Sequence, residues 1–440
     1  MKLLIFVRCW LFLIFAGLAG VAFAQMDHAQ HKMMHSKAEL GVSVAIDAQG
    51  QLWMVSREAL PESLSGPTEK SVGTEKSPVI LPGAYIVLQK SVDGGRSWSA
   101  PQRIIPTPEA VSADGENRPK LAFGSKGEFY IAYTRPLTKL YTGEIRFVRS
   151  VDGGFTFSAP VTVHQNHDEI THRFESMAVD KAGRIYIAWI DKRDAEAAKA
   201  RKEKYVGAAI YYAVSSDAGI SFNGDVKVAE HSCECCRIAL ELNELGRPVA
   251  LWRHVFASNT RDHALVELTA DGVLPSIERA TFDNWQVDAC PHQGPSVAFS
   301  ANGTRYQTWF SVRGEEGGVF YAAIDRNGKS SIPVRLGTEQ AEHAEVAVQG
   351  STVVIVWKQF DGKATTIIGQ ISQDGGATWQ QAVLAATTGN SDHPHLLNTM
   401  LSSVAASHSG IAGIVLVWNT QIEGVRVIRA DVFNSSVESK

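Results

Sequence analysis

The chain has 440 residues, of which 45% are hydrophobic and 20% are charged, and its formal net charge is -4 at pH 7. This composition is typical of a globular protein and excludes a mainly disordered, fibrous or multi-span membrane protein. Lys and Arg (42) nearly balance Asp and Glu (46), so the chain has no basic field that would favour nucleic acid as a partner.

The first 24 residues have the pattern of a secretory signal peptide. Lys2 and Arg8 precede a long apolar run, which ends in the small-residue signature Ala-Phe-Ala at residues 22–24. A membrane anchor is the alternative, but the cleavage signature favours removal of residues 1–24. No second run of about 20 apolar residues follows, so we expect an exported, periplasmic protein with no membrane span after cleavage.

Residues 25–37 form a polar segment that is rich in histidine and methionine. Imidazole and thioether groups are ligands that suit copper. We therefore predict a flexible tail that binds copper and gathers or passes on the ion; a disordered terminus without ligands is the alternative. The candidate ligands in this tail are His28, His31, Met33, Met34 and His35.

Seven apolar runs that contain an aromatic residue recur along the rest of the chain. Alternating apolar residues between turn residues predict β-strands. Another strand precedes each run, and one or two more follow it. The first interval is long because it contains an insertion rich in Gly, Pro, Ser and Thr at residues 57–82. The aligned aromatic residues are Trp53, Tyr133, Trp189, Trp252, Trp309, Trp357 and Trp418.

A short motif with the frame Ser-x-Asp-x-Gly-x-Ser/Thr-aromatic occurs four times. Its Asp-Gly pair suits a hairpin turn with positive φ angles. The motif resembles the Asp-box (BNR repeat) of the sialidase, or neuraminidase, superfamily of β-propellers. In that superfamily the box joins the third and fourth strands of a blade, on the face away from the active site. The four copies are residues 91–98, 150–157, 215–222 and 372–379.

These repeats predict an all-β fold, a single seven-bladed β-propeller over residues 38–435. The last unit has room for only three strands after Asn398, so a six-bladed ring with an irregular closing blade is the alternative. The resemblance further implies that the loops between blades share one face, which we call the upper face. Most of the 14 histidines and all four cysteines that follow the signal peptide then lie on that face, where propellers bind ligands.

We expect the cysteines and some of these histidines to hold a transition metal, because thiolate and imidazole suit copper and zinc. Copper is favoured because the tail also carries soft ligands. Two disulfides, one of them joining Cys290 to the 233–236 loop, are the alternative in an exported protein. Both interpretations hold if one pair is oxidised and the remainder binds metal. The main candidates are Cys233, Cys235, Cys236, Cys290 and His292, followed by His231, His343, His393 and His395.

The resemblance also implies glycoside hydrolysis, in which sialidases bind the substrate carboxylate with three arginines and use a Tyr/Glu pair and an Asp. Arg118, Arg173 and Arg237 occupy one slot in three successive units and are candidates to bind an anionic small molecule or glycan. The catalytic motifs are not matched: Arg118 lacks the flanking aromatic and isoleucine, and no tyrosine follows Tyr321. The sequence therefore favours metal binding, with a role in copper handling or redox chemistry. An exo-sialidase is the first alternative, and a non-enzymatic protein- or glycan-binding propeller is the second.

Overall fold

The computed structural model describes residues 39–60, 83–314, 316–399 and 413–431. The chain divides into two compact units, Met1–Lys37 and Ala38–Lys440, and every described residue belongs to the second. The predicted signal peptide, the predicted copper-binding tail and most of the 57–82 insertion lie outside the described residues. No described helix is long and apolar enough to cross a membrane.

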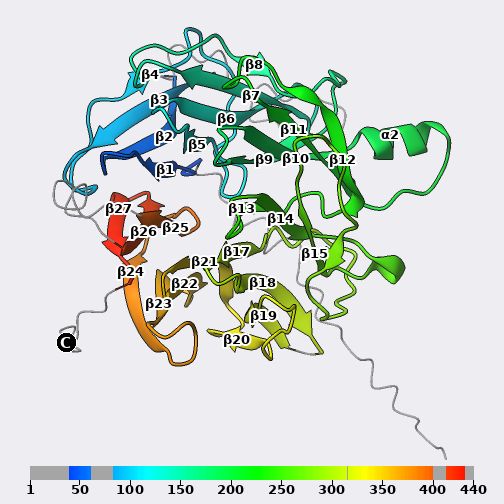
Figure 1. Cartoon of the computed structure of the whole chain (residues 1–440), viewed down its shortest axis with the longest axis vertical. Coiled ribbons are helices and arrows are strands. Elements are labelled where there is room, and N and C mark those ends of the chain that lie inside the picture. The colour runs from blue at the N-terminus through cyan, green and yellow to red at the C-terminus, as the bar shows by residue number, and fades with distance from the viewer. Residues whose placement is uncertain (1–38, 61–82, 315, 400–412, 432–440) are drawn as a thin grey trace, which may run out of the picture. The chain divides into compact units, whose positions relative to one another are not determined.

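In the described residues, twenty-seven strands form seven antiparallel sheets, and in each sheet the strands follow one another in chain order (Figure 1). The first three sheets contain β1 (Ser43–Ile46), β2 (Leu52–Ala59), β3 (Ala84–Ser91) and β4 (Gln102–Arg103); β5 (Lys120–Phe123), β6 (Phe129–Pro136), β7 (Gly143–Ser150) and β8 (Val161–Thr162); and β9 (His172–Val179), β10 (Ile185–Asp191), β11 (Ala208–Ser215) and β12 (Asn223–Ser232).

The remaining four sheets complete a ring. They contain β13 (Ala239–Leu242), β14 (Pro248–Arg253), β15 (His263–Glu267) and β16 (Glu278–Arg279); β17 (Ser296–Phe299), β18 (Arg305–Arg313), β19 (Glu316–Ile324) and β20 (Val334–Leu336); β21 (Ala341–Gln349), β22 (Thr352–Phe360), β23 (Thr365–Ser372) and β24 (Gln380–Thr387); and β25 (His395–Thr399), β26 (Gly413–Thr420) and β27 (Gly424–Arg429). The described helices are α2 (Arg193–Ala200) and the short 3-10 helix η1 (Ala257–Asn259).

The first strands of successive sheets contact one another around the centre, and β25 of the last sheet contacts β1 of the first. This arrangement is a seven-bladed β-propeller, so the predicted fold class is confirmed and the six-bladed alternative is wrong. The last blade has three strands, as its short sequence indicated. Its first strand begins at His395, which pairs with Val417 of β26, and the backbone N–H of Leu396 also donates a 2.8 Å hydrogen bond to Glu345 of the sixth blade.

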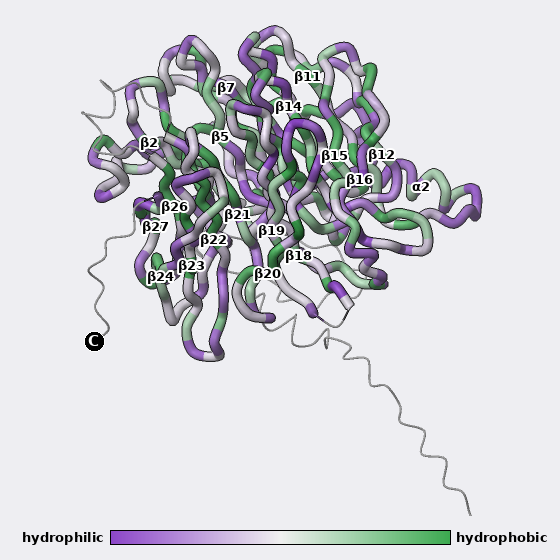
Figure 2. The backbone as a smooth tube through the Cα atoms, turned by 60° about the horizontal axis from the view of Figure 1, so that its bottom comes forward, coloured by the Kyte–Doolittle hydropathy of each residue, from purple (hydrophilic) through white to green (hydrophobic). Residues whose placement is uncertain are grey.

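The core lies between neighbouring blades. Each aligned aromatic residue lies in the second strand of its blade, and Trp189, Trp357 and Trp418 are completely buried. In one cluster Tyr130 of β6 packs with Ile187 of β10, so the contact crosses from the second blade to the third. Figure 2 shows the hydrophobic colour concentrated along strands such as β22 and β26. The apolar residues that alternate along these strands are therefore the ones buried between neighbouring blades.

The four repeated Ser-x-Asp turns all join the third and fourth strands of a blade. In the second copy Ser150 donates a 2.7 Å hydrogen bond to Asp152 and accepts one from the backbone N–H of Gly154. Asp152 in turn accepts hydrogen bonds from the N–H and the hydroxyl of Thr156. Gly154 has a φ of 88°, which disfavours larger residues. These contacts explain why Ser, Asp, Gly and Ser/Thr recur at fixed spacing.

Candidate metal and thiol site

The connections that enter successive blades place their polar side chains at one end of the ring. The β12–β13 and β16–β17 connections flank the fourth blade and together carry the four cysteines. Glu116, from the β4–β5 loop, reaches both of these connections across the ring entrance. It also contacts His343 at the start of β21, and His343 stacks on His393 of the β24–β25 loop. Residues far apart in sequence therefore meet here.

A disulfide bond joins Cys235 to Cys290 across 55 residues, with 6.3 Å between their Cα atoms. It links the two connections that flank the fourth blade, as the two-disulfide alternative predicted for Cys290, but the second disulfide of that alternative is not formed among the described residues. Cys233 and Cys236 remain free thiols, and both are buried. Two of the four candidate sulfur ligands are therefore bonded to each other and two are left as a pair.

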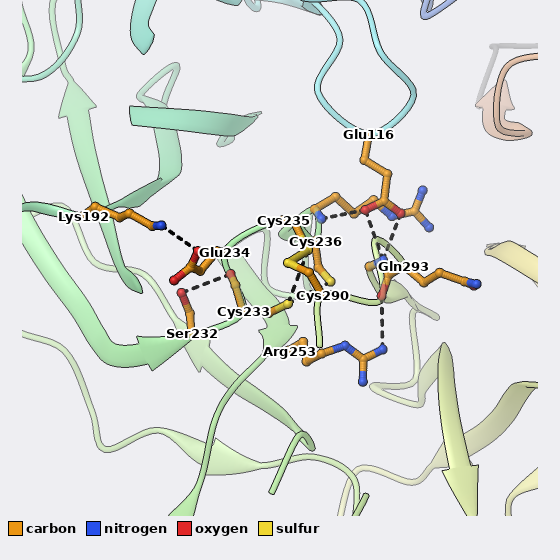
Figure 3. The surroundings of a disulfide bond; sticks show 12 residues. Glu116, Lys192, Ser232, Cys233, Glu234, Cys235, Cys236, Arg253, Cys290 and Gln293 are labelled. Carbon is orange, nitrogen blue, oxygen red and sulfur yellow. Dashed lines mark hydrogen bonds and ion pairs between the residues drawn. A yellow bond between two sulfur atoms is a disulfide. The ribbon is translucent and has the colours of Figure 1, made fainter. Parts of the chain in front are cut away.

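The two free thiols lie in contact beside the disulfide (Figure 3). The Sγ atoms of Cys233 and Cys236 are 3.2 Å apart, and the Sγ of Cys233 is 3.8 Å from that of Cys235. Only 2% of Cys233 and 3% of Cys236 is exposed, so water is nearly excluded from the pair. Cys233 is thus the central sulfur of a four-sulfur cluster made by Cys233, Cys235, Cys236 and Cys290.

Buried positive charge surrounds this cluster. Arg253 is 1% exposed and donates hydrogen bonds to the backbone carbonyls of Arg261, Gln293 and Phe310. Arg261 is 7% exposed. Within the described part of the chain, neither guanidinium forms an ion pair with a carboxylate. Unpaired buried charge is unfavourable, so these two groups favour a negative charge nearby.

The buried positive charge changes the pKa of the neighbouring thiols. The hydrogen bond from Cys236, together with the charges of Arg253 and Arg261, lowers the pKa of Cys233 to about 7 against the opposing effect of burial. Burial and the neighbouring Cys233 raise the pKa of Cys236. The shift favours the thiolate form of Cys233, which is the form that binds metals and acts as a nucleophile.

Glu116 holds the cysteine-bearing connections together. Its carboxylate accepts hydrogen bonds from the backbone N–H of Arg237 at 2.8 Å and of Gly294 at 2.9 Å, and His343 Nδ1 lies 3.3 Å away. Burial raises the pKa of Glu116, but the hydrogen bond from His343 and the charge of Arg237 outweigh it and hold the pKa at about 2. Glu116 was not among the residues predicted from the sequence; the signal that could have identified it is an acidic residue two positions before Arg118, in a connection predicted to lie on the upper face.

Two groups of potential ligand atoms lie within 4.8 Å of one another in the described residues: Cys233 with Cys235 and Cys290, and Glu116 with His343 and His393. The rings of His343 and His393 are stacked 3.4 Å apart, with 15° between their planes. Imidazole lone pairs lie in the ring plane, so nearly parallel rings do not direct nitrogen atoms at one ion. In the sulfur group, Cys235 and Cys290 are bonded to each other, so the free thiols Cys233 and Cys236 are the better-arranged candidate ligands.

The other predicted histidine ligands belong to neither group. His395 Nδ1 lies 3.1 Å from Glu345 Oε2, and His231 Nδ1 lies 3.0 Å from the carbonyl of Val206. His292 is exposed. The tail candidates, from His28 to His35, lie outside the described residues.

The three predicted anion-binding arginines have protein partners. Arg118 donates to Asp392 at 2.7 Å, and the guanidinium of Arg237 lies 2.9 Å from a Glu345 oxygen. A nitrogen of Arg173 lies 3.9 Å from Asp114. The guanidinium groups of Arg118 and Arg237 are therefore already used within the protein.

Comparisons with known proteins agree with this fold. No family model and no curated protein matches the chain. Among solved structures, an ulvan lyase of polysaccharide lyase family PL25 matches with a TM-score of 0.52 at 10% identity, over 88% of this chain and 92% of that chain. The polysaccharide lyase Uly1 matches with a TM-score of 0.51 at 8% identity, over 90% and 91%. The Hadza microbial sialidase Hz136 has a TM-score of 0.44 at 12% identity, over 79% and 73%.

At such low identity the lyase likenesses establish the fold and no activity, and the sialidase score carries no argument of its own. The fold defines the class of protein: a seven-bladed β-propeller. This particular propeller carries a buried thiol pair beside a disulfide at the entrance to its ring.

Proposed function

We propose that the protein is an exported copper-binding propeller in which Cys233 and Cys236 bind Cu(I) and the Cys235–Cys290 disulfide holds the adjacent connections. The observation that carries the proposal is the buried thiol pair, with its sulfur atoms 3.2 Å apart, close to Arg253 and Arg261, which form no ion pair with any carboxylate of the described residues. Soft thiolate ligands suit Cu(I), zinc and iron–sulfur clusters.

Charge and ligand number favour Cu(I) over zinc. Two thiolates and one Cu(I) ion carry a net charge of about -1, which offsets part of the buried positive charge of Arg253 and Arg261. Structural zinc sites almost always have four ligands, and catalytic zinc sites have three protein ligands. The disulfide removes Cys235 and Cys290 from the ligand set, so the remaining pair suits an ion that accepts two ligands.

The role that fits such a site is copper handling in the periplasm. The His/Met-rich segment at residues 25–37 would collect the ion at the surface, and the buried pair would hold it away from water and oxidants. The secretory signal pattern at residues 1–24 supports export to a compartment in which the disulfide persists. Redox chemistry at bound copper is the alternative role for the same site.

The proposal is tested by elemental analysis of the mature protein from the periplasm. We expect one copper ion per chain in the buried site after weakly bound copper is removed with a chelator. The Cys233→Ser variant loses this copper, because one thiol is left. The Cys235→Ser/Cys290→Ser double variant is the matched control and keeps it, because the pair is intact. Wild-type protein without copper, or Cys233→Ser protein that retains it, contradicts the proposal.

The sequence-based alternatives have less support. An exo-sialidase needs arginines that are free to bind a substrate carboxylate, whereas Arg118 and Arg237 already bind Asp392 and Glu345. A propeller that only recognises a protein or an anionic glycan needs no thiol pair. Its partner capture would survive the Cys233→Ser substitution.

A further inference from the structure

The four cysteines form a continuous row of sulfur atoms. Cys236 contacts Cys233 at 3.2 Å, Cys233 contacts Cys235 at 3.8 Å, and Cys235 is bonded to Cys290 (Figure 3). Thiol–disulfide exchange proceeds by attack of a thiolate on a disulfide sulfur, and its rate depends on access of one to the other. Here the attacking sulfur is held next to its target inside the folded protein.

We propose that these cysteines exchange disulfide partners, so that the Cys235–Cys290 bond converts reversibly into a Cys233–Cys236 bond. This inference goes beyond copper binding, because the exchange needs no metal. It assigns to the site an intramolecular thiol–disulfide reaction that opens and closes a covalent link between the connections on either side of the fourth blade.

The reaction balances within the chain. In the first step the Cys233 thiolate forms a bond to Cys235 Sγ, and the electron pair of the Cys235–Cys290 bond leaves with Cys290. In the second step the Cys236 thiolate forms a bond to Cys233 Sγ, and Cys235 leaves as a thiolate. The two protons lost by Cys233 and Cys236 are taken up by Cys235 and Cys290. No outside oxidant or reductant is required.

The surrounding structure suits a reversible reaction. Glu116 holds the backbone of both connections, through Arg237 on one side and Gly294 on the other, so they stay in place when the covalent link is open. Cys290 is partly exposed, whereas Cys233, Cys235 and Cys236 are buried. The exchange therefore moves a reducing thiol from the interior to the surface. If copper occupies Cys233 and Cys236 as proposed above, it locks the link closed.

Peptide mapping distinguishes the two states directly. Trypsin cuts after Lys227 and Arg237, so one peptide (228–237) holds three cysteines, and a second peptide (280–305) holds Cys290. The Cys235–Cys290 state yields these peptides cross-linked, and the exchanged state yields them separate, with Cys290 free for alkylation. Copper-free mature protein is incubated at neutral pH, quenched with acid at intervals over a day, alkylated, digested and analysed by mass spectrometry.

We expect a fraction of separate peptides that grows over minutes to hours, the usual range for uncatalysed exchange, and then reaches a plateau. The Cys233→Ser variant stays fully cross-linked. The Cys236→Ser variant still frees Cys290 but stops at a Cys233–Cys235 bond. Wild-type protein that stays fully cross-linked overturns the inference even if a variant misfolds. Equal release in folded wild type and Cys233→Ser overturns it as well. Copper content plays no part in this readout, so failure of copper binding is distinguished from failure of exchange.

Discussion

The chemistry of Cys233 depends on Cys236 in the same connection and on two buried arginines of the fourth blade, Arg253 and Arg261. The Cys-x-Cys-Cys spacing indicated a local role for these residues. Any of the three cysteines could form a disulfide with Cys290, however, and disulfide connectivity cannot be deduced from sequence. The structure pairs Cys235 with Cys290 and leaves Cys233 against Cys236. The buried Arg253 comes from β14, and its effect on Cys233 depends on tertiary packing that no sequence period reports.

At the same scale, Glu116 should make the protein sensitive to acid. Its folded pKa is about 2, below the ordinary value of 4.5, so it stabilises the fold above about pH 4.5, and this contribution is lost as the pH falls toward 2. Glu116→Gln presents an amide N–H₂ to backbone donors, and we expect it to lower the free energy of unfolding at pH 7 by about 2–3 kcal/mol.

Urea denaturation of wild type and Glu116→Gln at pH 7 and pH 3 measures this effect. The difference between the two proteins should shrink at pH 3, where the wild-type contribution is already reduced. Glu339→Gln, at an exposed position, is the matched control and should change neither value. A Glu116→Gln difference that is equal at both pH values contradicts the assignment of the effect to the carboxylate charge.

At the scale of single elements, the sequence predicted the long buried strands better than the short ones. The second strands have six to nine residues, so alternation and a buried aromatic residue identify them. The fourth strands β4, β8 and β16 have only two residues each, which is too short for any period to show. The places of β4 and β8 were indicated only by the Ser-x-Asp turns that precede them.

Those turns allow a prediction that separates stability from function. Asp152→Ala removes the acceptor for the N–H and the hydroxyl of Thr156, so we expect the thermal unfolding midpoint to fall by a few degrees. Asp152→Asn keeps one acceptor oxygen and should fall less. Because this turn lies at the end of the blade opposite the cysteine connections, copper content per folded chain stays unchanged in both variants. Loss of copper from the folded Asp152→Ala variant is the result that the structure does not allow.

At the scale of the whole molecule, seven blades were predictable because the same unit recurs, whereas the closure of the ring was not. Closure depends on contacts between the two ends of the described chain. Asn419 of β26 donates a 2.8 Å hydrogen bond to the carbonyl of Leu40, and Val42 packs with Val417. Each of these pairs joins residues more than 370 positions apart. A local sequence pattern cannot predict contacts between residues so far apart in the chain.

The buried ion pair between Arg118 and Asp392 belongs to this closure. Asp392 also accepts from the backbone N–H of Val42, so its side chain links the entries of the first, second and last blades. Asp392→Ala leaves the Arg118 charge buried and unpaired, and we expect it to cost about 3–5 kcal/mol of unfolding free energy. Asp288→Ala, at an exposed position, is the control for chemical denaturation. A loss below about 1 kcal/mol would show that Arg118 is free for another partner, such as the anion expected from the sequence.

The most direct test of the proposed function is X-ray absorption at the copper edge of the mature protein loaded with one equivalent of Cu(I). We predict a Cu(I) edge and a first shell of two sulfur atoms, which disappears in Cys233→Ser and persists in Cys235→Ser/Cys290→Ser. A first shell of nitrogen and oxygen alone would contradict the account, because it would place the copper on histidines and carboxylates and leave the thiol pair without a metal.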